Sequence, residues 1–214
     1  MVSNADARSA VPIPTRDQAT TPTVASRPSP EWPLKKTESS PRRDISVEYY
    51  GNPDGGGEIW LASPDGKNRR LLCAYSRWIE SILFSPDEQH LIVNNHRLSN
   101  LATADLYDRA SALEYKESRL DLTSEIHTFF SQKHPDFKDN FDHSYTDAIA
   151  WSATGDAVLI RFSGHAAPNN HTGAWFCVYD LKRKRPTLDL SVMNRGGTVI
   201  TPAGSRSESH SASP

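Results

Sequence analysis

One short pattern occurs twice in the chain, and a repeated pattern constrains a fold more than any single element does. Residues 81–93 read SILFSPDEQHLIV and residues 148–160 read AIAWSATGDAVLI. In both, an apolar run ends in an aromatic residue, a serine opens a polar turn, and a second apolar run follows. Each copy predicts a β-hairpin, because Pro86 presets the first corner of one turn and Gly155 can adopt a positive φ in the other.

The apolar residues of these runs are consecutive. A strand with one face in water alternates apolar and polar residues, whereas consecutive apolar residues, as at Leu91–Val93 and Val158–Ile160, indicate a sheet covered on both faces. The pattern therefore predicts an all-β protein in which antiparallel sheets are stacked face to face.

A second kind of hairpin alternates with the first. It occurs at residues 58–72, more weakly at 104–115, and again at 175–188, where a strand with aromatic residues runs into a charged turn and returns with leucines. The densest basic run, at residues 182–185, falls in the last of these turns. A turn needs soluble residues, so we interpret this run as a turn and not as a nucleic-acid-binding patch.

The two copies of the first hairpin are too far apart for a simple repeat. Trp151 follows Phe84 by 67 residues, whereas blade-forming repeats recur about every 40 to 45 residues, which leaves about 24 residues of insertion. We place the insertion at about residues 118–143. It contains Ile126, Phe129 and Phe130 at helical spacing before Pro135, and this predicts one short amphipathic helix on the side or end of the sheets.

Residues 58–93 resemble the TolB-type, WD-like β-propeller repeat. The resemblance lies in the runs EIW, SPDG and RRL between residues 58 and 71, in Trp78, and in FSPD at residues 84–87. With the weaker copy at Trp151 and the final hairpin, it covers most of residues 57–190. It implies an incomplete β-propeller of stacked antiparallel sheets with one short helical insertion and disordered termini.

The chain departs from the family pattern in two ways. Glu88 stands where the family's turn usually has glycine, and Ala153-Thr154 replaces Pro-Asp, so the resemblance does not fix the geometry of either turn. About two and a half blades are present, while closed propellers have about four to eight. The resemblance therefore implies an open stack of sheets, a fragment completed by a partner, or a relic of a longer protein.

The composition divides the chain into three parts. Residues 1–43 are rich in Pro, Ser and Thr, and residues 196–214 have the same character. Such segments bury too little apolar surface to offset the entropy lost on ordering. We therefore expect a disordered arm at 1–43, a partial β-propeller domain at 44–195 and a disordered tail at 196–214.

Charge and apolar content exclude several partners. The formal net charge is -2, so no strong field attracts nucleic acid or anionic lipid. A segment that spans a bilayer needs about 18 consecutive apolar residues, and no run in the chain comes close to this length. The first residues lack the apolar core of a secretory signal. The sequence as written predicts a cytoplasmic location, and the resemblance implies a periplasmic one. Cys73 and Cys177 lie in apolar runs and are expected to be buried thiols without a disulfide.

No motif for catalysis, metal or cofactor binding is recognisable. The chain has no nucleophile elbow and no phosphate-binding loop, which predicts a non-enzyme without a cofactor. Five histidines near the insertion and the following loops lack metal-ligand spacing: His127, His134, His143, His165 and His171. Four aspartates lack the spacing of a calcium loop and are interpreted as a charged loop: Asp136, Asp139, Asp142 and Asp147.

Recognition is expected on loops held by the rigid sheets. The candidate partner-binding residues are Arg77 and Trp78 in one loop, and His165, Asn169 and His171 in the loop from 164 to 173. We expect a non-enzymatic protein-interaction or scaffolding module with a protein partner or a second copy bound through an open sheet edge. The alternatives are an accessory propeller segment of a hydrolase or peptidase whose catalytic domain is absent from this chain, and a truncated product without a selected role.

Overall fold

The computed structural model describes residues 32–52, 55–133, 141–166 and 171–189. Within these ranges, residues 141–142, 165–166, 171–173 and 188–189 are described by their backbone alone. The described residues form a four-stranded sheet, an eight-stranded sheet and a single helix. The prediction of an all-β protein with one short helix is confirmed. In the described part of the chain, this helix is too short and too polar to cross a membrane.

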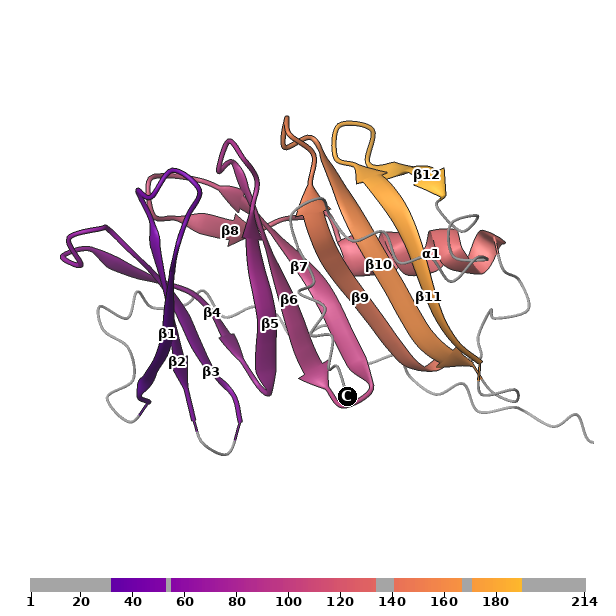
Figure 1. The fold of residues 1–214 in the computed structure, drawn as a ribbon, viewed down its shortest axis with the longest axis horizontal. Helices are drawn as coiled ribbons and strands as arrows, with labels where there is room; N and C mark the ends of the chain where they lie inside the picture. The colour runs from indigo at the N-terminus through magenta and orange to yellow at the C-terminus, as the bar shows by residue number, and fades with distance from the viewer. Residues whose placement is uncertain (1–31, 53–54, 134–140, 167–170, 190–214) are drawn as a thin grey trace, which may run out of the picture.

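Successive strands form three four-stranded antiparallel meanders, which follow one another across the molecule (Figure 1). The first meander contains β1 (Leu34–Ser39), β2 (Ser46–Gly51), β3 (Gly57–Ala62) and β4 (Arg69–Tyr75). The second contains β5 (Trp78–Phe84), β6 (His90–Leu98), β7 (Leu101–Arg109) and β8 (Tyr115–Glu117). After α1 (Leu122–Lys133), the third contains β9 (Phe141–Trp151), β10 (Ala157–Ala166), β11 (His171–Asp180) and β12 (Arg185–Asp189).

One turn geometry is used at four hairpins, which begin at Ser40, Ser63, Ser85 and Ser152. In each, the serine amide donates to the carbonyl five residues ahead, and the serine Oγ accepts a hydrogen bond from the amide of that same residue. The fourth residue of every turn has a positive φ between 57 and 74°. We call these hairpin connections the serine turns. Ser85 follows Ser40 by 45 residues and precedes Ser152 by 67, so the inserted helix accounts for the longer interval.

The serine turn at Ser40 corrects the predicted boundary of the disordered arm. Strand β1 lies inside residues 1–43, so the prediction of disorder is wrong over Leu34–Ser39. The side chains of β1 are mostly exposed and carry no apolar signal. The strand forms because its backbone pairs with β2 and because Tyr49 Oη donates to Glu38 at 2.7 Å. Residues 1–31 and 196–214 lie outside the described residues.

Glu88 occupies the fourth position of its serine turn, where two other serine turns have Gly66 and Gly155. Its φ is 57°, the left-handed conformation that a glycine would adopt most easily. Its buried carboxylate accepts the Arg42 amide at 2.8 Å and lies 3.5 Å from Arg109 Nη1, while Tyr115 Oη donates to its carbonyl at 2.6 Å. The serine turn is therefore kept, and the glutamate links the first two meanders.

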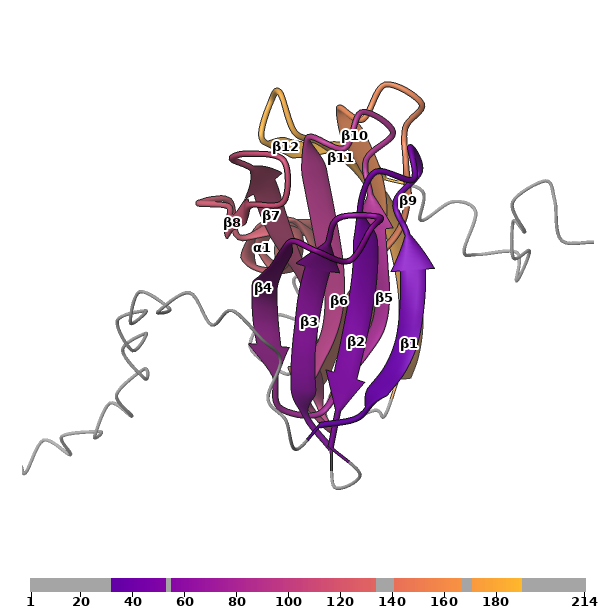
Figure 2. The ribbon, with the colours of Figure 1, turned by 90° about the vertical axis from the view of Figure 1, so that its left-hand side faces the viewer.

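The second meander is covered on both faces, as the run Leu91–Val93 predicts, whereas in Val158–Ile160 the middle residue Leu159 is only partly buried. On β6, Leu91 and Val93 face the first meander, while Ile92 faces α1 and the third meander. Seen along the stack in Figure 2, the first meander lies in front of the second. The buried residues between them are Ile45, Val47, Tyr49, Ile59, Leu61, Leu91, Val93, Tyr107 and Tyr115.

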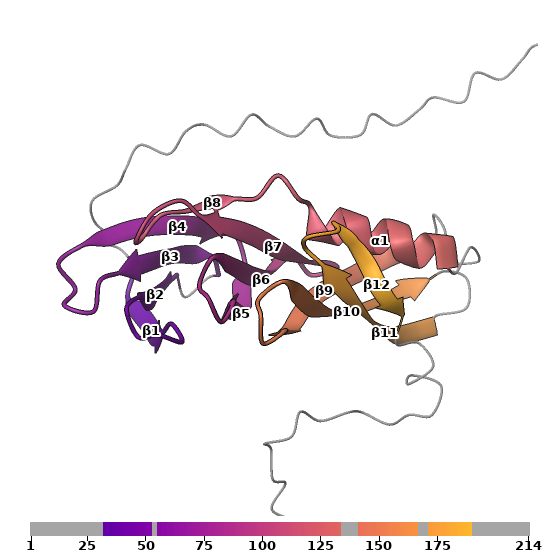
Figure 3. The same cartoon turned by 90° about the horizontal axis from the view of Figure 1, so that it is seen from above.

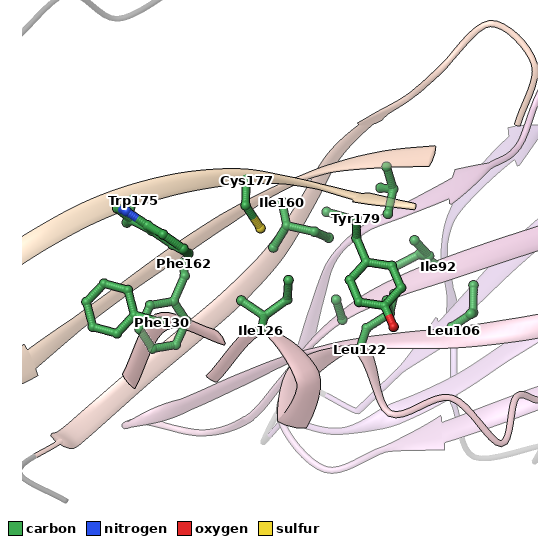
Figure 4. Close-up of a cluster of buried hydrophobic side chains, with 13 residues drawn as sticks. Ile92, Leu106, Leu122, Ile126, Phe130, Ile160, Phe162, Trp175, Cys177 and Tyr179 are labelled. Atoms are coloured by element: carbon green, nitrogen blue, oxygen red, sulfur yellow. The ribbon is translucent and has the colours of Figure 1, made fainter. Parts of the chain in front are cut away.

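Helix α1 packs on a sheet face, not on the side or end of the sheets as the sequence suggested. It buries Leu122, Ile126 and Phe130 against β10 and β11 (Figures 3 and 4). Phe130 packs against Phe162 and Trp175, with ring centroids 4.8 and 5.1 Å apart. The helix thus takes part in the core between the second and third meanders.

Neither cysteine forms a disulfide, as predicted. Cys177 is buried on β11, and burial raises the pKa of Cys73 to about 12. The basic run at residues 182–185 lies at the turn between β11 and β12, where Lys182 Nζ contacts Asp156 Oδ2 at 3.0 Å.

The aspartates of the serine turns make the stability of the fold depend on pH. Partial burial alone would raise the pKa of Asp87, but hydrogen bonds from Ser85 Oγ and the Gln89 amide outweigh it and hold the pKa below its usual value. Hydrogen bonds also lower the pKa of Asp44, Asp65 and Asp156. A lowered folded-state pKa stabilises the fold above the unfolded-state pKa, which is about 3.9 for aspartate, and this stabilisation is lost as pH falls through the folded-state pKa.

We therefore expect the urea midpoint to stay constant near neutral pH and to decrease once the pH is lowered below about 4. Unfolding followed by circular dichroism across this range tests the expectation. The variant Asp87→Asn should be less stable at neutral pH and should lose less on acidification than the unmodified chain. Equal acid sensitivity of the two proteins would contradict the role of Asp87.

Candidate functional site

Trp78 begins β5 and remains half exposed although it is held in place. Its ring stacks on His96 with centroids 4.6 Å apart and an interplanar angle of 17°, and Arg77 Cζ lies 5.2 Å from its centroid. Its exposed fraction is 44%. The predicted loop at Arg77 and Trp78 therefore presents a fixed aromatic surface.

The second predicted loop is only partly described. Asn169 lies outside the described residues, and His165 and His171 are described by their backbone, in β10 and β11. The register places His165 opposite His143 on β9, two residues from Tyr145, whose ring lies 6.1 Å from that of His96. Trp78 and the paired ends of β10 and β11 therefore lie at the end of the meanders opposite to the serine turns.

A β-bulge directs Glu80 toward His96. Trp78 pairs with His96 and Ile79 with Asn95, but Ser81 pairs with Asn94, so Glu80 is the extra residue. Bulges commonly redirect a side chain in this way. The Glu80 Oε2 atom lies 2.8 Å from His96 Nε2.

Strand β9 brings Asp147 to the same place because it crosses the second meander. It starts beside β7, where the Ser144 amide donates to the Asn100 carbonyl at 3.0 Å, and ends beside β5, where Trp151 Nε1 donates to the Leu83 carbonyl at 3.1 Å. Between these points, Asn94 of β6 exchanges two hydrogen bonds of 2.8 Å with the Ala148 backbone. The preceding residue is Asp147.

Glu80, His96 and Asp147 form a cluster in which one nitrogen or oxygen atom of each lies within 4.8 Å of the others. Asp147 is 3% exposed. Its Oδ2 atom accepts a hydrogen bond from Arg161 Nη2 at 2.7 Å, and its Oδ1 atom has no hydrogen-bond partner among the described residues. The cluster offers one imidazole, two carboxylates and one neighbouring guanidinium.

A cavity of about 430 Å³ lies beside β7, and Leu101 and Thr103–Leu106 of this strand form part of its wall. The outer edge of β7 pairs with β9 at residues 101–102 and with β8 at 107–109, and the backbone between these points is covered by the segment leading into α1. There Ser118 donates its amide to the Leu106 carbonyl and Thr123 Oγ1 accepts the Ala104 amide. Charges of both signs line the cavity, including Arg97, Asp105, Glu117, Arg119 and Asp121.

The sequence interpretation missed this cluster and the cavity. Its signal for the cluster was the polar run Asn94–His96, which ends a strand that is otherwise apolar. Asp147 was interpreted as part of a charged loop, and this is wrong because Asp147 is buried within β9. Asp136, Asp139 and His134 lie outside the described residues, and Asp142 is described by its backbone alone.

No protein-family model matches the chain, and no curated protein matches its sequence at a significant level.

Proposed function

We propose that this protein is a non-enzymatic protein-interaction module, built as an open stack of propeller-like blades. Three successive four-stranded meanders, each with a serine turn between its first two strands, support this interpretation. The 45-residue interval from Ser40 to Ser85 also agrees with the period of WD-like repeats. A rigid repeated scaffold of this kind is suited to present side chains for recognition.

The observation that carries the proposal is an exposed but immobilised tryptophan. Trp78 is 44% exposed and Leu98 is 56% exposed, and both lie at the end of the second meander opposite to the serine turn. We call Arg77, Trp78 and Leu98 the Trp78 surface. Tryptophan and arginine are enriched among the residues that dominate binding energy, and a ring already stacked on His96 loses little freedom on binding.

The side chains of the Trp78 surface are better candidates for the contact than the outer sheet edges. Edge strand β1 carries the exposed residues Lys35 and Lys36, and edge strand β12 contains Pro186. Lysine and proline on an edge strand oppose pairing with another strand. At edge strand β5, the Leu83 carbonyl accepts a hydrogen bond from Trp151 Nε1, and the carbonyl of Arg77, just before the strand, accepts one from the Gly56 amide. These two carbonyls are therefore already paired.

The first partner to test is a second copy of the chain. Sedimentation velocity from low to high micromolar concentration is expected to show reversible self-association. Trp78→Ala should weaken it by about tenfold or more, the usual effect of removing a dominant interface residue. Leu34→Ala is the matched control, since Leu34 is 51% exposed on β1, the outer edge strand of the first meander.

Two results would contradict the proposal. Equal effects of Trp78→Ala and Leu34→Ala would show that the Trp78 surface is not the contact. Turnover of peptidase or esterase substrates by the purified chain, unchanged by Trp78→Ala, would show that the protein is an enzyme.

A further inference from the structure

We propose that Glu80, His96 and Asp147 form a binding site for a transition-metal dication of the zinc class. One ligand atom from each residue lies within 4.8 Å of the other two. The residues come from β5, β6 and β9, so the site forms only when the third meander docks on the second. Three protein ligands that leave a position for water or another group are typical of zinc sites that are not purely structural.

The buried carboxylate of Asp147 is the observation that points to a cation. A buried polar atom is almost always hydrogen-bonded, and one that is not costs free energy. Arg161 binds the Oδ2 atom at 2.7 Å, which leaves Oδ1 without a hydrogen-bond partner among the described residues. A ligating carboxylate is commonly held by such a second partner, so Arg161 would orient Asp147 for coordination through Oδ1.

The other two ligands are held near the required positions. His96 is fixed by its stack on Trp78, and its Nε2 atom already lies 2.8 Å from Glu80 Oε2. Ligand atoms of a tetrahedral zinc ion are about 3.4 Å apart, since each bond is about 2.1 Å long. The widest separation, which is at most 4.8 Å, must therefore close by up to about 1.4 Å, and the 2.8 Å pair must open by about 0.6 Å. The Glu80 side chain can move in this way because it is half exposed on a bulge.

The ligand set determines the kind of metal. Calcium and magnesium prefer oxygen ligands alone, whereas imidazole together with carboxylate suits zinc and its first-row neighbours. With neutral His96, the two carboxylates and Arg161 give the cluster a net charge of -1, which a dication reverses. This charge favours a cation and disfavours an anionic ligand.

The test is titration of the full chain with Zn²⁺ by calorimetry and with Co²⁺ by visible absorption, whose bands report coordination by nitrogen and oxygen. We expect one Zn²⁺ per chain at this site. Glu80→Gln should weaken it by tenfold or more, and so should His96→Gln, because each removes a ligand. Glu80 is half exposed, so Glu80→Gln should remain folded, which far-ultraviolet circular dichroism verifies.

His90→Gln is the matched control. His90 Nδ1 lies 2.9 Å from Asp108 Oδ1, a similar histidine–carboxylate pair between β6 and β7 that has no third ligand among the described residues. This variant should bind Zn²⁺ like the unmodified chain. Equal affinity of the Glu80→Gln and unmodified chains, or the absence of zinc binding, would overturn the proposal. Metal binding is measured on the isolated chain, so it can fail while the proposed protein interaction holds, and the reverse is also true.

Discussion

Replacement of Phe162 by alanine is expected to destabilise the protein by about 3–5 kcal/mol, the usual range for a buried phenylalanine. Phe162 is buried on β10, and its ring centroid lies 4.8 Å from that of Phe130 and 6.0 Å from that of His127. The variant therefore leaves a cavity where α1 meets the third meander (Figure 4). Urea unfolding followed by far-ultraviolet circular dichroism measures the loss.

Phe176→Ala is the matched control for this prediction. Phe176 lies on the neighbouring strand β11, but its side chain points to the opposite face of the sheet from buried Trp175 and Cys177 and is only partly buried. Its removal should cost about 1–2 kcal/mol, since less apolar surface returns to water. Equal losses for the two variants would contradict the assignment of the core to the α1 side of the third meander.

Asn94→Leu is expected to cost about 2–5 kcal/mol, because it leaves buried polar groups without partners. Asn94 is buried on β6, and its side chain accepts the Ala148 amide and donates to the Ala148 carbonyl, both at 2.8 Å. Leucine has a similar size but makes neither bond. Because these bonds join β6 to β9, hydrogen exchange of the Ala148 amide should accelerate together with the loss of stability.

The adjacent residue supplies the control for Asn94. Asn95 faces the opposite side of β6, and its side chain donates one hydrogen bond of 3.1 Å to Asp105 Oδ2. Asp105 keeps its contact with Arg97 at 2.9 Å when Asn95 is replaced. Asn95→Leu should therefore cost less than Asn94→Leu and leave exchange of the Ala148 amide unchanged. A larger effect of Asn95→Leu would contradict the role assigned to Asn94.

Local sequence patterns predicted much of the fold. The run from Leu91 to Val93 indicated a strand covered on both faces, and β6 is covered by the first meander on one face and the third on the other. The helix was predicted from the i, i+3, i+4 spacing of Ile126, Phe129 and Phe130, which involves only two adjacent helical turns. The first strand was missed because its side chains are exposed, and backbone pairing leaves no mark on composition.

Local sequence sets the geometry of each serine turn, since such a turn depends on contacts among six consecutive residues, as from Ser85 to His90. The tertiary structure alone decided the cluster of Glu80, His96 and Asp147. Its formation needs a bulge that turns Glu80 toward His96 and a strand that crosses the second meander. Both depend on contacts between residues far apart in the chain, and no local spacing records how such segments meet.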